Sequence, residues 1–444
     1  MITAPAKTIK AGFVAAALAA ACVPADADEG ALGIASAGWF EYGRIVKSLD
    51  TTGEMDLEKG MQSAGAQIDA RYGSGPFRIH AGLGVRMSHA ISPGSGSGGY
   101  APMVSVPYVA GAHLDYAFID RAETGLTAQA GLFPYDYAPE SRNLGLYLLR
   151  GPVYPGLLTS GYETKSVLPI ANTLGFRVNH RRGSFEQDFL LTFENGWPTY
   201  WDASPAYIAA YRFGGVFRIG GGIQFNHFLP VDGKITDPGN ENVTYRFPKS
   251  PGGGDSDSVF IAFRGVKVMA DFAFDPKPWL EGAGEGGLWG PEDLKFYGEA
   301  AILGLDRDRA HNDLYGPLSK RMPIMLGFNL PAFGYLDRLN VEAEYYGAPW
   351  EDDPTIFEHT RSSRLTPIPK RSALDTNTTR DNFKWSIQAS KTLAGHFRIT
   401  AQAASDHFRP GIFTGYGEAA PPKREVPFFS PAEWYWTVRL AYFF

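Results

Sequence analysis

The amino-acid sequence predicts an all-β fold, an antiparallel transmembrane β-barrel of about 16 strands with short periplasmic turns and long extracellular loops. Three observations predict it. Apolar and polar residues alternate with a period of two in many segments, most of them about nine to thirteen residues long, as a tilted membrane strand requires. The connections between these segments alternate between short and long. Beyond the N-terminal segment 1–27, no stretch approaches about 18 consecutive apolar residues, so the sequence predicts no transmembrane helix. Only helices and closed barrels satisfy their backbone hydrogen bonds in lipid, which leaves the barrel.

Composition agrees with this fold class. Aromatic residues make up 14% of the chain, which also contains 52 glycines and 22 tyrosines, a profile that favours strands joined by turns. The formal net charge is −6, without the concentrated basic patch that nucleic-acid binding normally needs. Nucleic acid is therefore not an expected partner.

The N-terminal segment 1–27 is predicted to be a secretory signal peptide. Lys7 and Lys10 precede a short apolar core, "AGFVAAALAAACV", and a small-x-small cleavage site ends at Ala27. Lipoprotein processing at Cys22 is the alternative, although Ala19 occupies the position where such sites usually carry a leucine-like residue. The mature barrel is then expected to span 28–444.

The predicted strands share one apolar face and one polar face. In 76–88, "PFRIHAGLGVRMS", Phe77 and Leu83 belong to the apolar face and His80 to the polar face. In 106–119, Tyr108 is expected on the apolar face and His113 on the other. In chain order the predicted strands are 39–47, 63–73, 76–88, 104–119, 121–133, 170–180, 184–194, 204–214, 216–227, 258–275, 293–305, 321–331, 338–347, 381–393, 396–408 and 433–444.

The lengths of the connections predict which end of the barrel faces the periplasm. Short links at 73–75, 120, 181–183, 214–215 and 394–395 are typical of periplasmic turns, and most other links are long. The link 276–292 is long although it falls on the short-turn side, and the pattern does not explain it. A soluble β-sandwich has the same alternation, but strand length and loop asymmetry favour the membrane barrel. Tryptophan and tyrosine near strand ends suit interfacial girdles: Trp39, Tyr108, Tyr207, Trp385 and Trp434.

Charged residues concentrate on the polar face, which is predicted to line a wet lumen. A Lys or Arg facing the middle of a bilayer costs about 2–4 kcal/mol, so the opposite register is excluded. The signs are mixed, which favours neutral polar solutes or a weak ion preference. The predicted pore-lining residues are Arg78, Arg86, Asp115, Arg177, Glu186, Asp188, Arg212, Arg218, Lys267, Asp271, Glu299, Glu342, Glu344, Arg398 and Arg439.

The long link 134–169 is a candidate for a loop that folds inward and narrows the lumen. Its stretch "LGLYLLR" is more apolar than a solvated loop normally is. Leu144, Leu146, Leu148 and Leu149 are expected to pack against the wall. The charged residues expected to face the channel are Asp136, Glu140, Arg142 and Arg150.

The C-terminal sequence "WYWTVRLAYFF" resembles the last strand of Gram-negative outer-membrane proteins. The resemblance implies that this strand is the signal read by the barrel-assembly machinery, through Val438, Leu440, Tyr442 and Phe444. The glycine often found earlier in that signature is absent here. The strand pattern extends the resemblance, at the level of topology only, to porins, in which a third long loop folds into the barrel.

These observations predict an outer-membrane porin, a passive channel for small polar solutes or sugars. A structural or adhesive barrel with a closed lumen is the alternative. No H-E-x-x-H, no G-x-S-x-G and no zinc spacing occurs, so neither an enzyme nor a metal or cofactor site is expected. The expected partners are outer-membrane lipid and lipopolysaccharide, the assembly machinery, and further copies of the chain in a homotrimer.

Overall fold

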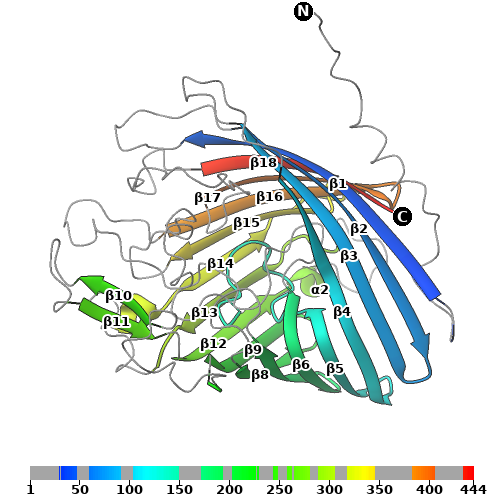
Figure 1. Cartoon of the computed structure of the whole chain (residues 1–444), viewed down its shortest axis with the longest axis vertical. Helices are drawn as coiled ribbons and strands as arrows, with labels where there is room; N and C mark the ends of the chain where they lie inside the picture. The colour runs from blue at the N-terminus through cyan, green and yellow to red at the C-terminus, as the bar shows by residue number, and fades with distance from the viewer. Residues whose placement is uncertain are drawn as a thin grey trace, which may run out of the picture.

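The computed structural model describes a closed barrel. The described residues are 30, 32–47, 60–91, 104–149, 172–193, 203–226, 228–229, 244–248, 258–262, 265–280, 289–305, 318–345, 383–405 and 434–444. Sixteen antiparallel strands follow one another around the barrel, and the last strand pairs with the first (Figure 1). Because the ring is closed, no strand edge in it is left without a partner.

The barrel strands are β1 (Leu32–Lys47), β2 (Gly60–Ser74), β3 (Phe77–Ile91), β4 (Val104–Asp120), β5 (Thr124–Pro134), β6 (Asn172–Arg182), β7 (Phe185–Phe193), β8 (Ala203–Phe213), β9 (Phe217–Asn226), β12 (Gly265–Phe274), β13 (Phe296–Ile302), β14 (Ile324–Asn329), β15 (Arg338–Tyr345), β16 (Phe383–Leu393), β17 (Phe397–Ser405) and β18 (Trp434–Phe443). Each corresponds to one predicted segment, so the fold class is confirmed. A short helix, α2 (Lys277–Leu280), and a 3-10 turn, η4 (Leu318–Arg321), lie between strands.

The largest differences from the predicted boundaries are at two segments. β1 begins at Leu32 rather than at residue 39. The segment 258–275 is two strands: β12 belongs to the barrel, whereas β11 (Ser258–Ala262) pairs with β10 (Thr244–Pro248) in a separate two-stranded sheet. Figure 1 shows this hairpin beyond the left-hand ends of the barrel strands. A period of two cannot distinguish these arrangements, because a hairpin outside the barrel has the same period.

The outer surface of the barrel is apolar. Leu83 on β3 is 66% exposed and Leu326 on β14 is 58% exposed, on the face opposite the interior. Other large apolar side chains are exposed on strands around the ring: Ile68, Leu114, Phe176, Phe189, Ile219, Ile387 and Leu440. A continuous apolar surface of this kind marks contact with lipid or with another protein rather than with water.

Two aromatic residues expected in the interfacial girdles face the interior instead. The pairing of β3 with β4 shifts between Gly82 and Leu83, so that Val109 points outward and Tyr108 points inward, where its hydroxyl donates to Gln67. A β-bulge therefore reverses the face that strict alternation predicts. Trp39 is buried inside as well.

Gly65 makes room for the Trp39 indole. A Cβ atom added at Gly65 would lie 2.0 Å from Cζ2 of that ring, which only glycine avoids. The inward position of Trp39 thus depends on its partner across the β1–β2 pair. No helix among the described residues has the length and apolar character needed to cross a membrane.

Candidate functional site

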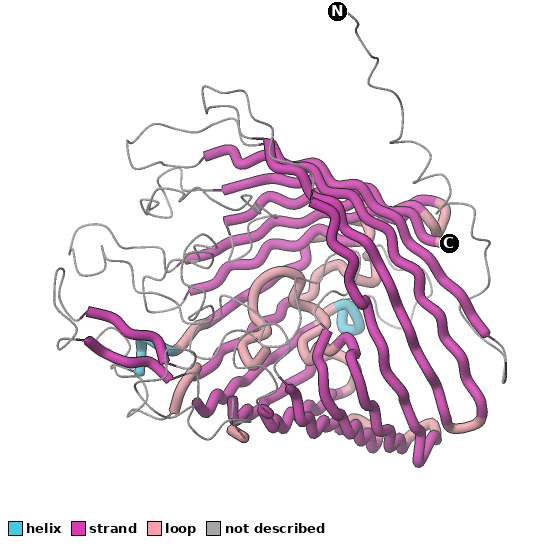
Figure 2. Tube along the Cα trace, in the orientation of Figure 1, coloured by secondary structure: helices cyan, strands magenta, loops and turns pink. Residues whose placement is uncertain are grey.

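The segment 135–149, which follows β5, packs inside the barrel. In Figure 1 it lies within the ring of strands, and Figure 2 shows it as loop surrounded by strand. Its hydrogen bonds reach residues of β7, β9, β12, β13 and β15. This segment, which we call the internal loop, therefore lies against the inner wall between β7 and β15. The residues 150–169 of the predicted loop, including Arg150, lie outside the described residues.

Apolar side chains hold the internal loop against the wall. Leu144, Tyr147 and Leu148 are almost completely buried, and Leu146 and Leu149 nearly so. They form one cluster with wall residues Leu190, Ala206, Ile208, Met269, Tyr297 and Met325. Burying a leucine side chain contributes about 1.5–3 kcal/mol, so these contacts favour the folded-in position.

Glu342 on β15 receives the first set of backbone hydrogen bonds from the internal loop. The amide groups of Asn143 and Leu144 each donate to its carboxylate at 2.9 Å, and the amide of Arg142 donates to its other oxygen. The Tyr297 hydroxyl donates to it at 3.0 Å. Glu342 is 0% exposed. A buried carboxylate needs several donors, and the loop supplies most of them.

Glu299 on β13 receives the second set. The successive amides of Leu146 and Tyr147 donate to its two oxygens at 2.7 and 2.9 Å. Leu146 has a φ of +60°, a conformation uncommon for a residue with a side chain. Adjacent N–H groups that converge in this way form an anion-binding concavity. The internal loop therefore binds a carboxylate of its own barrel.

Tyrosine hydroxyl groups complete these contacts. The Tyr137 hydroxyl donates to Glu299 at 2.7 Å, and the Tyr147 hydroxyl donates to Glu344 at 3.0 Å. Burial, together with the adjacent Glu299 carboxylate, raises the pKa of Tyr137 well above its usual value. Tyr137 therefore stays protonated and remains a donor.

Cationic residues bind the carbonyl groups of the internal loop. Arg218 on β9 pairs with Asp271 at 2.8 Å and donates to the Tyr137 carbonyl at 2.6 Å. Lys267 on β12 is 0% exposed and donates to the Leu148 carbonyl at 3.4 Å. The wall thus presents acceptors to the loop amides and donors to the loop carbonyls.

Many residues predicted to line the pore lie beneath the internal loop. They are on the interior face, but the loop and its contacts bury them: Asp188, Lys267, Asp271, Glu299, Glu342 and Glu344. Arg177 pairs with Asp188 at 2.7 Å, and the Tyr135 hydroxyl also donates to Asp188. Strand parity indicates which face a residue occupies, but it cannot indicate what covers that face.

The other predicted lining residues lie elsewhere on the wall. Arg78 and Asp120 are 3.9 Å apart and well exposed, and Arg212 lies 3.9 Å from Glu186. Arg398 lies over the Phe443 ring, and Arg439 pairs with Glu41. Asp115 lies 3.8 Å from His113. The side chain of Arg86 is not among those described.

The predicted channel-facing residues of the internal loop are more exposed than its leucines. Asp136 is exposed, and Glu140 and Arg142 are partly exposed. The assembly-signal candidates belong to the outer face of β18, where Leu440 and Tyr442 are exposed and Val438 and Phe444 are partly exposed.

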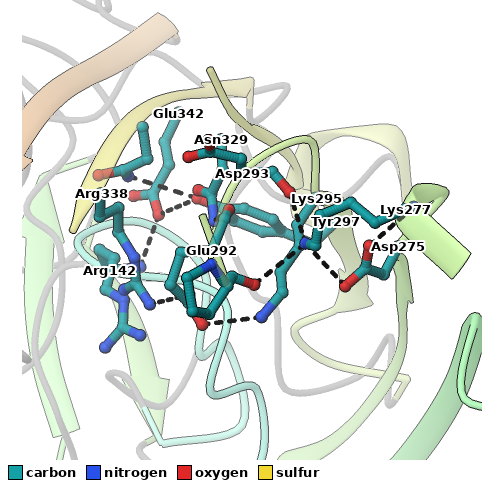
Figure 3. Close-up of polar contacts among 12 residues, drawn as sticks. Arg142, Asp275, Lys277, Glu292, Asp293, Lys295, Tyr297, Asn329, Arg338 and Glu342 are labelled. Carbon is teal, nitrogen blue, oxygen red and sulfur yellow. Dashed lines mark hydrogen bonds and ion pairs between the residues drawn. The ribbon is translucent and has the colours of Figure 1, made fainter. Parts of the chain in front are cut away.

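A charged network that the sequence did not indicate lies at the turn end of the barrel (Figure 3). Glu292 pairs with Lys295 at 2.8 Å and with Arg338 at the start of β15. Lys277 of α2 pairs with Asp275 at 2.9 Å and donates to the Asp293 carbonyl at 2.7 Å. The described parts of the long link between β12 and β13 are therefore fixed to the neighbouring turn. The closely spaced acidic and basic residues in "PEDLK" were the only indication of it in the sequence.

Comparisons with known proteins give similarity at the level of solved structures alone. No family model matches, and no curated protein matches. A triple mutant of the porin from Rhodopseudomonas blastica is 10% identical, with a TM-score of 0.40, covering 93% of this chain and 100% of that chain. A second mutant of the Rh. blastica porin is 9% identical with a TM-score of 0.38 at the same coverage. Values this low establish neither a family nor a function, so the closed barrel is defined by this chain's own strand pairing.

Proposed function

We propose that the protein is an outer-membrane porin, a passive diffusion channel for small polar solutes or sugars, with 134–169 as its constriction loop. The observation that carries this proposal is the internal loop, fastened by backbone hydrogen bonds to Glu299 and Glu342 on the inner wall of a closed barrel. A loop held in this way reduces the width of the lumen.

The outer surface supports the membrane location. Leu83 and Leu326 are exposed outside, and large apolar residues recur on the same face around the ring. Water would make this surface unfavourable by about 25 cal/mol for each Å² of apolar area, whereas lipid would not. Because every strand of the barrel is paired with two neighbours, its backbone needs no water as a hydrogen-bond partner in the hydrocarbon.

The exposed charges on the internal loop and on the wall opposite it favour passage of neutral solutes. Asp136, Glu140 and Arg142 of the internal loop carry both signs, and Arg71 on the opposite wall is exposed. A selective ion filter normally presents rings dominated by one sign. We therefore expect width to decide passage more strongly than charge.

Remaining expectations about targeting and assembly are part of the same proposal. Residues 1–27 would direct the chain across the inner membrane, and the outer face of β18 would present Val438, Leu440, Tyr442 and Phe444 to the assembly machinery. Lipopolysaccharide and lipid would cover the exterior, and copies of the chain would associate as homotrimers.

Reconstitution tests the channel. In planar bilayers the purified barrel should give reproducible single-channel steps, and proteoliposomes should swell in small sugars with a rate that falls as the sugars become larger. Denaturant-treated protein serves as the control for leakage. Silent bilayers in which insertion is verified by protease protection would contradict the porin and support the closed, adhesive barrel.

A further inference from the structure

A second polar site lies on the interior wall formed by β2, β3 and β4. His80 and His113 are directly opposite each other in the β3–β4 pair. Their Nδ1 atoms are 3.4 Å apart, and their ring centroids are 4.7 Å apart. Two nitrogen ligands at about 2.0–2.1 Å from a tetrahedral zinc ion are separated by about 3.3–3.4 Å. The spacing of the two imidazoles therefore matches a shared metal ion.

Each imidazole has a carboxylate on its other side. Asp69 Oδ1 lies 3.0 Å from His80 Nε2, and Asp115 Oδ2 lies 3.8 Å from His113 Nε2. Gln67 donates to Asp69 at 2.7 Å and thereby fixes it. Carboxylates that accept the distal N–H of a histidine orient the ring and increase its basicity toward a metal. Asp69 occupies one such position by a hydrogen bond, and Asp115 lies near the other at 3.8 Å.

The ring nitrogens of both histidines have more than one partner within reach. With the His80 ring proton on Nε2, Asp69 accepts it, and His80 Nδ1 then has a lone pair 3.4 Å from His113 Nδ1. His113 Nδ1 is also 3.2 Å from the Leu132 carbonyl. Asp115 Oδ1 is buried and has no hydrogen-bond partner among the described residues. If the His113 proton moves to Nε2, it faces Asp115 and leaves Nδ1 free to bind.

The backbone around the pair leaves space for these side chains. A Cβ at Gly82 would lie 2.4 Å from Asp69 Oδ1, and a Cβ at Gly111 would lie 2.9 Å from His80 Nδ1. Gly82 and Gly111 are opposite each other, next to the bulge at Ala110. Bulges are frequent next to functional sites because they redirect side chains. The two glycines and the bulge create the pocket that the carboxylate and the imidazole occupy.

We propose that His80 and His113 bind one divalent transition-metal ion of the zinc and copper class through their Nδ1 atoms. Imidazole nitrogen is a preferred ligand for these ions. Within the described residues no three His, Cys, Asp or Glu side chains surround one metal position, so solvent completes the coordination. The histidine side chains are 14% and 9% exposed, enough for an ion to enter from the lumen. Binding requires both Nδ1 atoms to be unprotonated, with the ring protons on the Nε2 atoms that face Asp69 and Asp115.

The surrounding charge permits a cation. Arg71 is directly opposite His80 in the β2–β3 pair and adds one positive charge. Asp69 and Asp115 add two negative charges on either side of the histidines. The local balance therefore favours a divalent ion, although Arg71 weakens its binding.

The test uses the full mature barrel in detergent, freed of metal with a chelator and titrated with CuSO₄ or ZnCl₂. Calorimetry should show one saturable site, and the electron paramagnetic resonance spectrum of bound Cu²⁺ should show coupling to two imidazole nitrogens. His80→Gln and His113→Gln should each remove the saturable site. Asp69→Asn should weaken it about 10- to 100-fold, as loss of an orienting carboxylate does elsewhere. Folding of every variant is checked by heat-dependent gel mobility.

His180→Gln is the matched control, because His180 on β6 also has a strand neighbour as hydrogen-bond partner, Gln187, but is not paired with another histidine among the residues that the structure describes. Its binding isotherm should equal that of the unsubstituted barrel. Saturable binding that survives in both His80→Gln and His113→Gln would overturn the assignment, and so would a Cu²⁺ spectrum with one nitrogen or none. These readouts do not depend on channel activity, so they are independent of the proposed porin function.

Discussion

The Glu342 carboxylate accepts a hydrogen bond of 2.9 Å from the amide of Leu144, although the two residues are 198 positions apart. This contact joins the wall strand β15 to the internal loop. The carboxylate also accepts the amides of Arg142 and Asn143, so a single side chain fixes three consecutive residues. The position of the loop in the lumen therefore depends strongly on Glu342.

Replacing Glu342 with alanine should release the internal loop. The substitution leaves three amide donors without an acceptor, and each unsatisfied buried donor costs about 1–3 kcal/mol. We expect a larger and noisier single-channel conductance, and cleavage of the loop by protease added to intact proteoliposomes. The control is Glu186→Ala, at a partly exposed position. An unchanged conductance would show that the internal loop does not form the constriction.

Reversing the charge of the internal loop should change ion selectivity. Arg142 is partly exposed on the loop, so replacing it and Arg150 with glutamate adds negative charge near the narrow part of the lumen. Reversal potentials measured across a salt gradient should shift toward cation preference. Arg78→Glu, at a well-exposed position paired with Asp120, should shift them much less, because solvent screens it. Equal shifts in both variants would exclude a special role for the loop.

An arginine on the outer face should be far more harmful than one inside. Leu83 is exposed on the apolar exterior of β3, and Leu83→Arg should cost about 2–4 kcal/mol if that surface is in the hydrocarbon. The comparison is Gln388→Arg on β16, where the side chain belongs to the polar interior and pairs with Gln402. Unfolding in urea with lipid vesicles measures both. Equal free energies of unfolding would contradict a lipid-facing exterior.

Breaking the ion pair at the seam of the barrel should destabilise the ring. Arg439 on β18 pairs with Glu41 on β1, and both side chains are largely buried. Replacing Glu41 with alanine leaves a buried guanidinium without its partner, a change that costs about 3–5 kcal/mol. The temperature at which gel mobility changes should fall. The double variant Glu41→Met with Arg439→Met should recover much of the loss, because no unpaired charge remains.

The sequence predicted the barrel because its signal is local. Outward and inward residues alternate along each strand, so a segment such as "RLNVEAEY" reveals both faces without knowledge of its neighbours. Alternation alone gave the wrong face for Tyr108. The bulge that turns it inward depends on the pairing of β3 with β4, and one extra residue is invisible to a period of two.

The candidate site was predictable in part. The apolar stretch around Leu148 indicated packing against a wall, and the wall charges were assigned to the interior. The amide clamp on Glu299 was not predictable, because it requires a positive φ at Leu146 and a contact between residues 153 positions apart in the chain. The His80–His113 pair likewise depends on register, since the two histidines are 33 positions apart in the chain.

The exchange of hydrogen bonds between Ser36 and Phe444 at the β1–β18 seam has a consequence for biogenesis. β1 pairs with its neighbour in the chain, β2, and gains its second partner only when β18 is present. Contacts so distant in sequence form slowly, and until then two open edges would be exposed to other chains. Ring closure therefore requires β18, and a variant without this strand would leave β1 and β17 with open edges, which favour aggregation over a smaller ring.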